Sequence, residues 1–177
     1  MELTIGSTTR PYKDLSYEEA FDRIAKAGYS DVAVFRNPGS AEVTSESSKA
    51  DVAAVRKAAD DAGVVPSMLI GRTQLAMGLD SAVDDYKRLI DNVADLGVTW
   101  LLDCGTSKKE FYEDYFELMR QAAPHAEQGG VHITMKPHGG ISLTSEHLLT
   151  ACERVNHQAF AICYDPGNII HYTAGEM

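Results

Sequence analysis

Two short apolar runs in the last third of the chain each end in residues that can take part in acid–base or binding chemistry. Lys136 and His138 follow the run VHITM, and Asp165 and Asn168 follow FAICY, in both cases beside a turn that contains glycine. In parallel α/β proteins ligands bind at the carboxyl ends of the strands, because loops there vary freely while the sheet holds them in place. We therefore predict a small-molecule site at these two segments.

Lys136 alternates with apolar residues, so it shares one strand face with Thr134 and His132. On a face that lines a cavity, Lys136 could act as a base, as a Schiff-base nucleophile or as an anchor for a carboxylate or phosphate. The alternative is a structural ion pair with Asp165 across neighbouring strand ends. Asp165 could instead cap the Pro-Gly-Asn turn that follows it, and His138 could bind a metal ion or stabilise its own turn.

Other polar residues also follow apolar runs. Arg10, Arg36 and Arg72 each lie a few residues after such a run, and together they could clamp an anionic substrate. Asp103 and Cys104 end a fourth run, and either could face the site. Cys104 has no obvious thiolate-stabilising neighbour in the sequence, which favours a small buried residue over a nucleophile.

Apolar, β-rich runs alternate with longer amphipathic segments. The strands are expected near Leu3–Ser7, Asp31–Phe35, Val64–Ile70, Val98–Cys104, Val131–Lys136 and Phe160–Tyr164, and the helices near Tyr17–Ala27, Ser48–Ala62, Ser81–Leu96, Lys109–Glu127 and Ser145–Asn156. Ser16 and Glu19 have the spacing of a capping box, and Pro124 predicts a kink or break near Ala123. Strict alternation with short connections predicts a parallel sheet, either open or closed into a barrel.

Composition limits the function classes. The 177 residues are 44% hydrophobic and 24% charged, as in ordinary globular proteins, and the formal net charge is −10. That charge disfavours a nucleic-acid partner. No apolar run approaches the roughly 20 residues that span a bilayer, and the amino terminus lacks the features of a signal peptide. Three cysteines without a CxxC pair favour a reduced, cytoplasmic protein with no membrane partner.

Several segments, taken in order, are similar to one known family. The runs LTIGSTT, EEAFDRIAKAGYSDVAVF, AEQGGVHITMKPHGG and ICYDPGN resemble the xylose-isomerase-like TIM-barrel superfamily, and most closely its sugar-phosphate isomerase/epimerase branch. The resemblance covers nearly the whole chain, although no single motif is diagnostic. It implies a (β/α) TIM-barrel fold whose active site lies at the carboxyl ends of the strands.

The resemblance also implies a divalent metal ion, Mn, Mg, Co or Zn, held by a Glu after strand five, an Asp after strand six, and a His and a Glu from strands seven and eight. Asp165 stands where the Asp belongs, but Lys136 occupies the position of the Glu. Since a protonated lysine cannot ligate a metal, either His138 replaces it beside Asp165 or the metal is absent. Ala33 and Asn168 also depart from the family's frequent Glu and His.

A complete barrel takes about 250 residues, whereas this chain predicts about six β/α units. We expect residues 1–177 to form one incomplete, C-terminally shortened barrel domain. An open barrel leaves strand edges and apolar surface uncovered, which predicts a homo-oligomer.

We expect an isomerase, epimerase or related lyase of carbohydrate metabolism that removes a proton next to the carbonyl of a sugar or sugar phosphate. Lys136 and Asp165 are its predicted catalytic residues, and His138, Asn168 and Arg72 are its predicted substrate contacts. Two alternatives stay open: a catalytically inactive relative that serves as a binding or assembly module, and a metal-dependent phosphodiesterase of the AP-endonuclease type.

Overall fold

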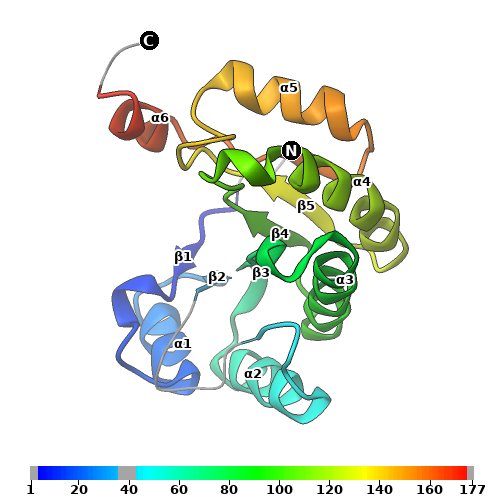
Figure 1. Cartoon of the computed structure of the whole chain (residues 1–177). Coiled ribbons are helices and arrows are strands. Elements are labelled where there is room, and N and C mark those ends of the chain that lie inside the picture. The colour runs from blue at the N-terminus through cyan, green and yellow to red at the C-terminus, as the bar shows by residue number, and fades with distance from the viewer. Residues whose placement is uncertain (1–3, 36–42, 175–177) are drawn as a thin grey trace.

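Six parallel strands form a single sheet in the order of the chain (Figure 1). The structure is a computed structural model that describes residues 4–35 and 43–174. The strands are β1 (Ser7–Thr8), β2 (Asp31–Val34), β3 (Val65–Ile70), β4 (Trp100–Asp103), β5 (His132–Met135) and β6 (Phe160–Ile162). Within the described residues β1 and β6 each pair on one side only, so both are edge strands.

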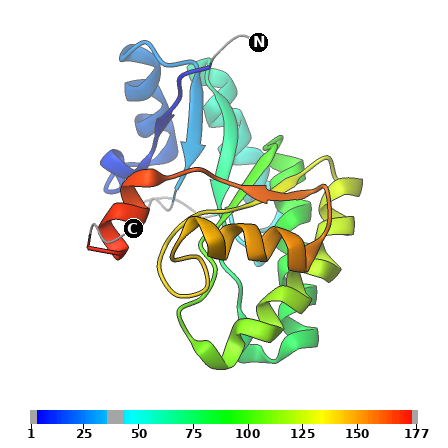
Figure 2. The same cartoon turned by 90° about the horizontal axis from the view of Figure 1, so that it is seen from above.

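Helices alternate with the strands and neighbour one another around the outside of the curved sheet (Figures 1 and 2). The α-helices are α1 (Tyr17–Lys26), α2 (Lys49–Ala62), α3 (Leu79–Leu96), α4 (Tyr112–Gln128), α5 (Ser145–Val155) and α6 (Pro166–Tyr172). Three short 3-10 helices, η1 (Arg10–Tyr12), η2 (Leu75–Met77) and η3 (Lys109–Phe111), lie in the connections. No helix in the described ranges has the length and apolar character needed to cross a membrane.

The predicted β/α barrel architecture is confirmed, with six β/α units in sequence order. The first strand is shorter than predicted and lies at Ser7–Thr8. Of the kink or break predicted near Ala123, the break is wrong, because α4 continues through Pro124 to Gln128. The short helix α6 was not predicted.

Local sequence signals explain the helix boundaries. The Ser16 side chain accepts a hydrogen bond from the backbone N–H of Glu19, and the Glu19 side chain accepts one from the backbone N–H of Ser16, so the predicted capping box is present. Helices α2 and α3 end at Gly63 and Gly97, which adopt the left-handed conformation that glycine tolerates.

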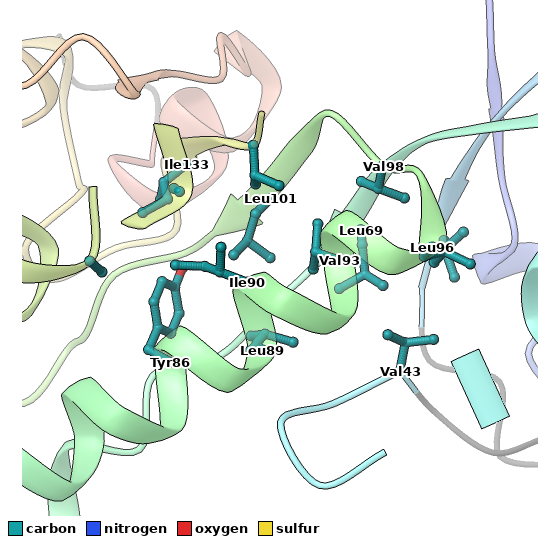
Figure 3. Packing of buried hydrophobic residues seen from close by; sticks show 14 of the residues in the cluster. Val43, Leu69, Tyr86, Leu89, Ile90, Val93, Leu96, Val98, Leu101 and Ile133 are labelled. Atoms are coloured by element: carbon teal, nitrogen blue, oxygen red, sulfur yellow. The ribbon is translucent and has the colours of Figure 1, made fainter. Parts of the chain in front are cut away.

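The hydrophobic core lies between the sheet and the helices. Leu89, Ile90 and Val93 recur on one side of α3 and point toward Leu69 and Leu101 of the strands (Figure 3). All five side chains are at most 4% exposed. Burying one side chain of this kind stabilises the fold by roughly 1.5–3 kcal/mol. We call this side of the sheet the helix-covered face and the opposite side the inner face.

One carboxylate is buried within that apolar layer. Asp103, the last residue of β4, is 1% exposed and lies on the helix-covered face. Its Oδ1 accepts hydrogen bonds from the Tyr115 hydroxyl at 2.8 Å and from the Gly105 N–H at 2.7 Å, and the Tyr86 hydroxyl lies 3.3 Å from Oδ2. Burial raises the pKa of Asp103 from 3.8 to about 6, although these three donors oppose the shift.

This raised pKa predicts a pH-dependent stability. Between about pH 4 and pH 6 the unfolded chain loses the Asp103 proton while the folded chain keeps it, so the free energy of unfolding falls as the pH rises, by about 3 kcal/mol in total. Asp103→Asn lacks this titration. We expect the advantage of the wild type over Asp103→Asn to shrink by about that amount between pH 4 and pH 7 in urea unfolding.

The matched control is Asp84→Asn, which removes one carboxylate from an exposed position of α3. A constant difference between the wild type and Asp103→Asn across the same pH range would contradict the assignment.

Candidate active site

The inner face carries a row of four side chains at the carboxyl ends of the strands. The strand register pairs Ile70 with Leu102 and Asp103 with Met135, and backbone bonds continue it from Gly71 N–H to Leu102 O at 2.8 Å and from Lys136 N–H to Asp103 O at 2.8 Å. Gly71 and Asp103 lie on the helix-covered face. Because side chains alternate between the two faces of a strand, the residues that directly follow them, and those in register on the neighbouring strands, lie on the inner face. These are Arg72, Cys104, Lys136 and Cys163, which we call the rim row.

Lys136 meets Asp165 just beyond this row. The Lys136 Nζ lies 3.3 Å from Asp165 Oδ2, and the two side chains are 15% and 31% exposed. Asp165 Oδ1 also accepts the backbone N–H of Asn168 at 3.0 Å, which caps α6. The structure thus brings the two predicted catalytic residues together, and Asp165 serves as a helix cap as well. Their catalytic roles stay predictions.

Helix α6 contacts the loop that follows β5, at the carboxyl ends of the strands. Asn168 Nδ2 donates to the Pro137 carbonyl at 2.7 Å. The Tyr172 hydroxyl lies 3.2 Å from His138 Nε2, and the two rings are 5.1 Å apart between centroids. Asn168 and His138 are therefore positioned by α6, and Tyr172 is a residue that the sequence analysis did not assign to the site. Its spacing of four residues from Asn168, one helical turn, is the signal that could have indicated it.

A cavity of about 350 Å³ opens beside the rim row. It is lined by Ile70, Gly71, Arg72, Thr73, Asp103, Cys104, Gly105 and His138. Arg72 is exposed, and it forms no ion pair with another residue in the described part of the chain. Arg72 also lines a second cavity of about 180 Å³, together with the buried Asp85, which pairs with Arg88 at 3.2 Å.

The two thiols of the rim row are neutral at physiological pH. Burial, and next the negative charge of Asp103, raise the pKa of Cys104 to about 11, while Lys136 and Arg72 oppose the shift. Burial also raises the pKa of Cys163. A thiol that resists deprotonation is a poor nucleophile, so the geometry supports the structural interpretation of Cys104. Asp103, the other residue considered at this strand end, directs its carboxylate to the helix-covered face.

The three arginines considered as an anion clamp are not equivalent. Arg72 lines the cavity, whereas Arg10 lies exposed on η1 and lines neither of these two cavities. Arg36 falls outside the described residues.

The expected metal ligands do not form a complete metal site. Among the residues that the structure describes, no three His, Cys, Asp or Glu side chains are grouped so that they could hold a metal ion. Lys136 contacts one oxygen of Asp165, and His138 contacts the Tyr172 hydroxyl. The residues present therefore do not fit a metal ion by themselves, and a metal role for Asp165 and His138 stays a prediction.

Comparisons with known proteins agree with this architecture. The family model for the xylose isomerase-like TIM barrel matches residues 21–177. A search of curated protein sequences finds no match.

Several solved structures share the fold. A xylose isomerase-like TIM barrel protein from Mycobacterium smegmatis, in complex with magnesium, superposes with a TM-score of 0.75 at 15% identity, covering 94% of this chain and 66% of the other. A D-psicose 3-epimerase solved with D-fructose superposes with a TM-score of 0.68 at 16% identity, and the match covers 89% of this chain and 62% of the other. An AP endonuclease, family 2, from Brucella melitensis superposes with a TM-score of 0.70 at 13% identity, and the match covers 96% of this chain and 70% of the other. The chain thus spans somewhat less than two thirds of the first two structures, and identities this low show the fold alone.

The loop that carries His138 packs closely against the backbone of the preceding loop at Gly140. Gly140 has a φ of +56°, and an added Cβ would lie 2.5 Å from both the Ser107 Cα and the Thr106 carbonyl oxygen. Since backbone atoms cannot move aside cheaply, we expect Gly140→Ala to lower the free energy of unfolding by about 2–5 kcal/mol, combining left-handed strain and overpacking. Chemical denaturation measures this loss, and NMR should show shifted His138 ring signals.

Gly130→Ala is the matched control, because Gly130 has a φ of +70° but no atom within 4 Å of the added Cβ. It should lose only the strain contribution, about 1–2 kcal/mol. Equal losses for the two variants would show that the loop is not closely packed at Gly140.

Proposed function

Because the chain belongs to the xylose isomerase-like TIM barrel family, we propose that it is an isomerase, epimerase or related lyase that acts on a sugar or sugar derivative by proton transfer next to a carbonyl. The observation that carries this proposal is the ion pair between Lys136 and Asp165 at adjacent strand ends. The epimerase among the structures with the same fold supports a carbohydrate substrate.

In the proposed mechanism the substrate oxygens replace each partner of the ion pair. Lys136 donates to the carbonyl oxygen and stabilises the negative charge that develops there when the neighbouring carbon loses its proton. Asp165, released from Lys136, accepts a hydrogen bond from the adjacent hydroxyl group. An ammonium group that donates to a carboxylate is poorly suited to act as the base, which favours the electrophilic role for Lys136.

The base has to lie close to this ion pair. His138 stands two residues after Lys136 and lines the 350 Å³ cavity, and imidazole is the side chain best suited to exchange a proton near neutral pH. We assign the proton transfer at carbon to His138, with Tyr172 and Asn168 holding its loop in place. No step of this mechanism uses a metal ion.

The AP-endonuclease alternative has the fold of a relative in its favour. The formal charge of −10 opposes it, since phosphodiester backbones are bound by clustered cations. An inactive binding module would keep the cavity but would not catalyse proton exchange. Incubation of the wild-type chain with sugars in D₂O distinguishes the two possibilities.

Lys136→Met should lower the rate of proton exchange at the carbon next to the carbonyl by about 100-fold or more, as expected for loss of one donor to a developing oxyanion. The assay follows the loss of the carbon-bound proton signal by NMR when a panel of aldoses and ketoses is incubated with the chain in D₂O. The far-ultraviolet circular dichroism of the variant should stay unchanged.

Lys57→Met is the control, because Lys57 is 73% exposed and its ion-pair partner among the described residues is Asp61 on its own helix. Unchanged exchange in Lys136→Met on a confirmed substrate would reduce Lys136 to a structural residue. No exchange with any sugar in the wild type would favour the binding-module alternative.

We also propose that the 177-residue chain self-associates through its sheet edges. Exposed apolar side chains lie beside both edge strands: Ile5 is 68% exposed before β1, and Ile162 and Tyr164 are 36% and 78% exposed at and after β6. Strand edges and apolar patches of this kind are usually covered. Sedimentation velocity should show a dimer or larger species, and Tyr164→Lys should weaken association by about tenfold or more.

Leu149→Lys is the control for added charge, because Leu149 is 57% exposed on α5 and does not belong to either edge strand. A monomer at all concentrations, without binding of a dye that reports apolar surface, would contradict self-association.

A further inference from the structure

The rim row carries two cationic side chains, of which one is paired with a carboxylate. Arg72 and Lys136 each carry one positive charge; Asp165 pairs with Lys136, and the carboxylate of Asp103 points to the helix-covered face between two tyrosine hydroxyls. Cys104 stands between the two cations, and its neutral thiol does not offset them. In a chain with a formal charge of −10, a cation without an ion-pair partner among the described residues thus lies at the carboxyl ends of the strands.

The cation without an ion-pair partner among the described residues is Arg72. Lys136 is paired with Asp165 at 3.3 Å, whereas Arg72 has no ion-pair partner among the described residues. Asp85 lines the neighbouring 180 Å³ cavity, but Arg88 contacts its carboxylate at 3.2 Å. The guanidinium of Arg72 is therefore exposed at the cavity with its donors available to a ligand.

The positions of the two cations set the size of a ligand that reaches both. Arg72 and Lys136 follow the carboxyl ends of β3 and β5, and strands in a sheet lie about 4.8 Å apart, so their backbones are about 10 Å apart across the row. Their side chains shorten that distance for a ligand between them. A substrate with its carbonyl at Lys136 can thus place a group several carbons away beside Arg72.

We propose that Arg72 binds an anionic oxygen group, a carboxylate or a phosphate ester, at the end of the substrate remote from the reacting carbonyl. Guanidinium groups match these two anions because both offer paired oxygens to its planar array of donors. This inference rests on the proposed function, since it takes the reacting carbonyl to lie at the Lys136–Asp165 pair. It extends the proposed function by stating that the substrate is anionic and that Arg72 selects for this charge.

Three hexoses that differ only at the sixth carbon test the proposal. D-Glucose carries a hydroxyl there, D-glucuronate a carboxylate and D-glucose 6-phosphate a phosphate. Binding to the wild-type chain is measured by NMR titration, following the backbone signals of Gly71 and Gly105. At least one of the charged hexoses should bind tenfold or more tightly than glucose, and the stronger of the two identifies the anion.

Arg72→Gln should lower the affinity for the preferred charged hexose tenfold or more and leave that for glucose nearly unchanged. Arg23→Gln removes the same charge from an exposed position of α1 and should keep the full preference. Equal binding of all three hexoses to the wild type, or a preference that survives in Arg72→Gln, would overturn the proposal.

The outcome is separable from that of the proposed function. If the preference for a charged hexose is lost in Arg72→Gln but the wild type shows no proton exchange in D₂O, the anion subsite is supported and the enzymatic reaction is refuted. Proton exchange that depends on Lys136 but not on the charge of the sugar would retain the reaction and refute the subsite.

Discussion

The alternation of side chains along parallel strands is the constraint on which the rest of the structure depends. One face of the sheet must bury its side chains against α1 to α5, and the other face is left to line the mouth. At the carboxyl end of β4 this alternation separates two neighbouring residues. Asp103 enters the core between Tyr86 and Tyr115, and Cys104 joins the row with Arg72 and Lys136. A register shift of one residue would exchange these environments.

The two carboxylates at strand ends show how environment divides their roles. Asp103 is 1% exposed, receives only neutral donors and has a pKa raised to about 6 by burial. Asp165 is partly exposed and contacts an ammonium group and the amino terminus of α6. A buried carboxylate with neutral donors contributes rigidity between sheet and helices, whereas the partly exposed Asp165 is the one that we propose for contact with substrate.

The sequence was sufficient to predict the strand order, the parallel sheet and the helix caps, because these depend on local periodicity and on residues such as Ser16 and Glu19. It could not predict that α4 passes through Pro124, since the buried Ala122, Ala123 and Ala126 pack that turn against the core and override the local preference. It placed Lys136 and Asp165 at neighbouring strand ends, which is a consequence of topology. The contact of Tyr172 with His138 depends on α6, a helix whose start is signalled by Asp165 and Pro166 but whose packing against the loop after β5 is a tertiary contact that local sequence does not determine.

The distribution of charge differs between the outer surface and the carboxyl ends of the strands. Surface pairs such as Lys57 with Asp61 are exposed and contribute little to stability, so the acidic surface mainly repels anions from most of the molecule. The mouth differs, because Arg72 and Lys136 are aligned by the register of β3, β4 and β5 and are separated by a neutral thiol. In our proposal an anionic substrate is attracted to this row, where Arg72 has no ion-pair partner among the described residues. The same parallel register that builds the core thus also determines where charge can be recognised.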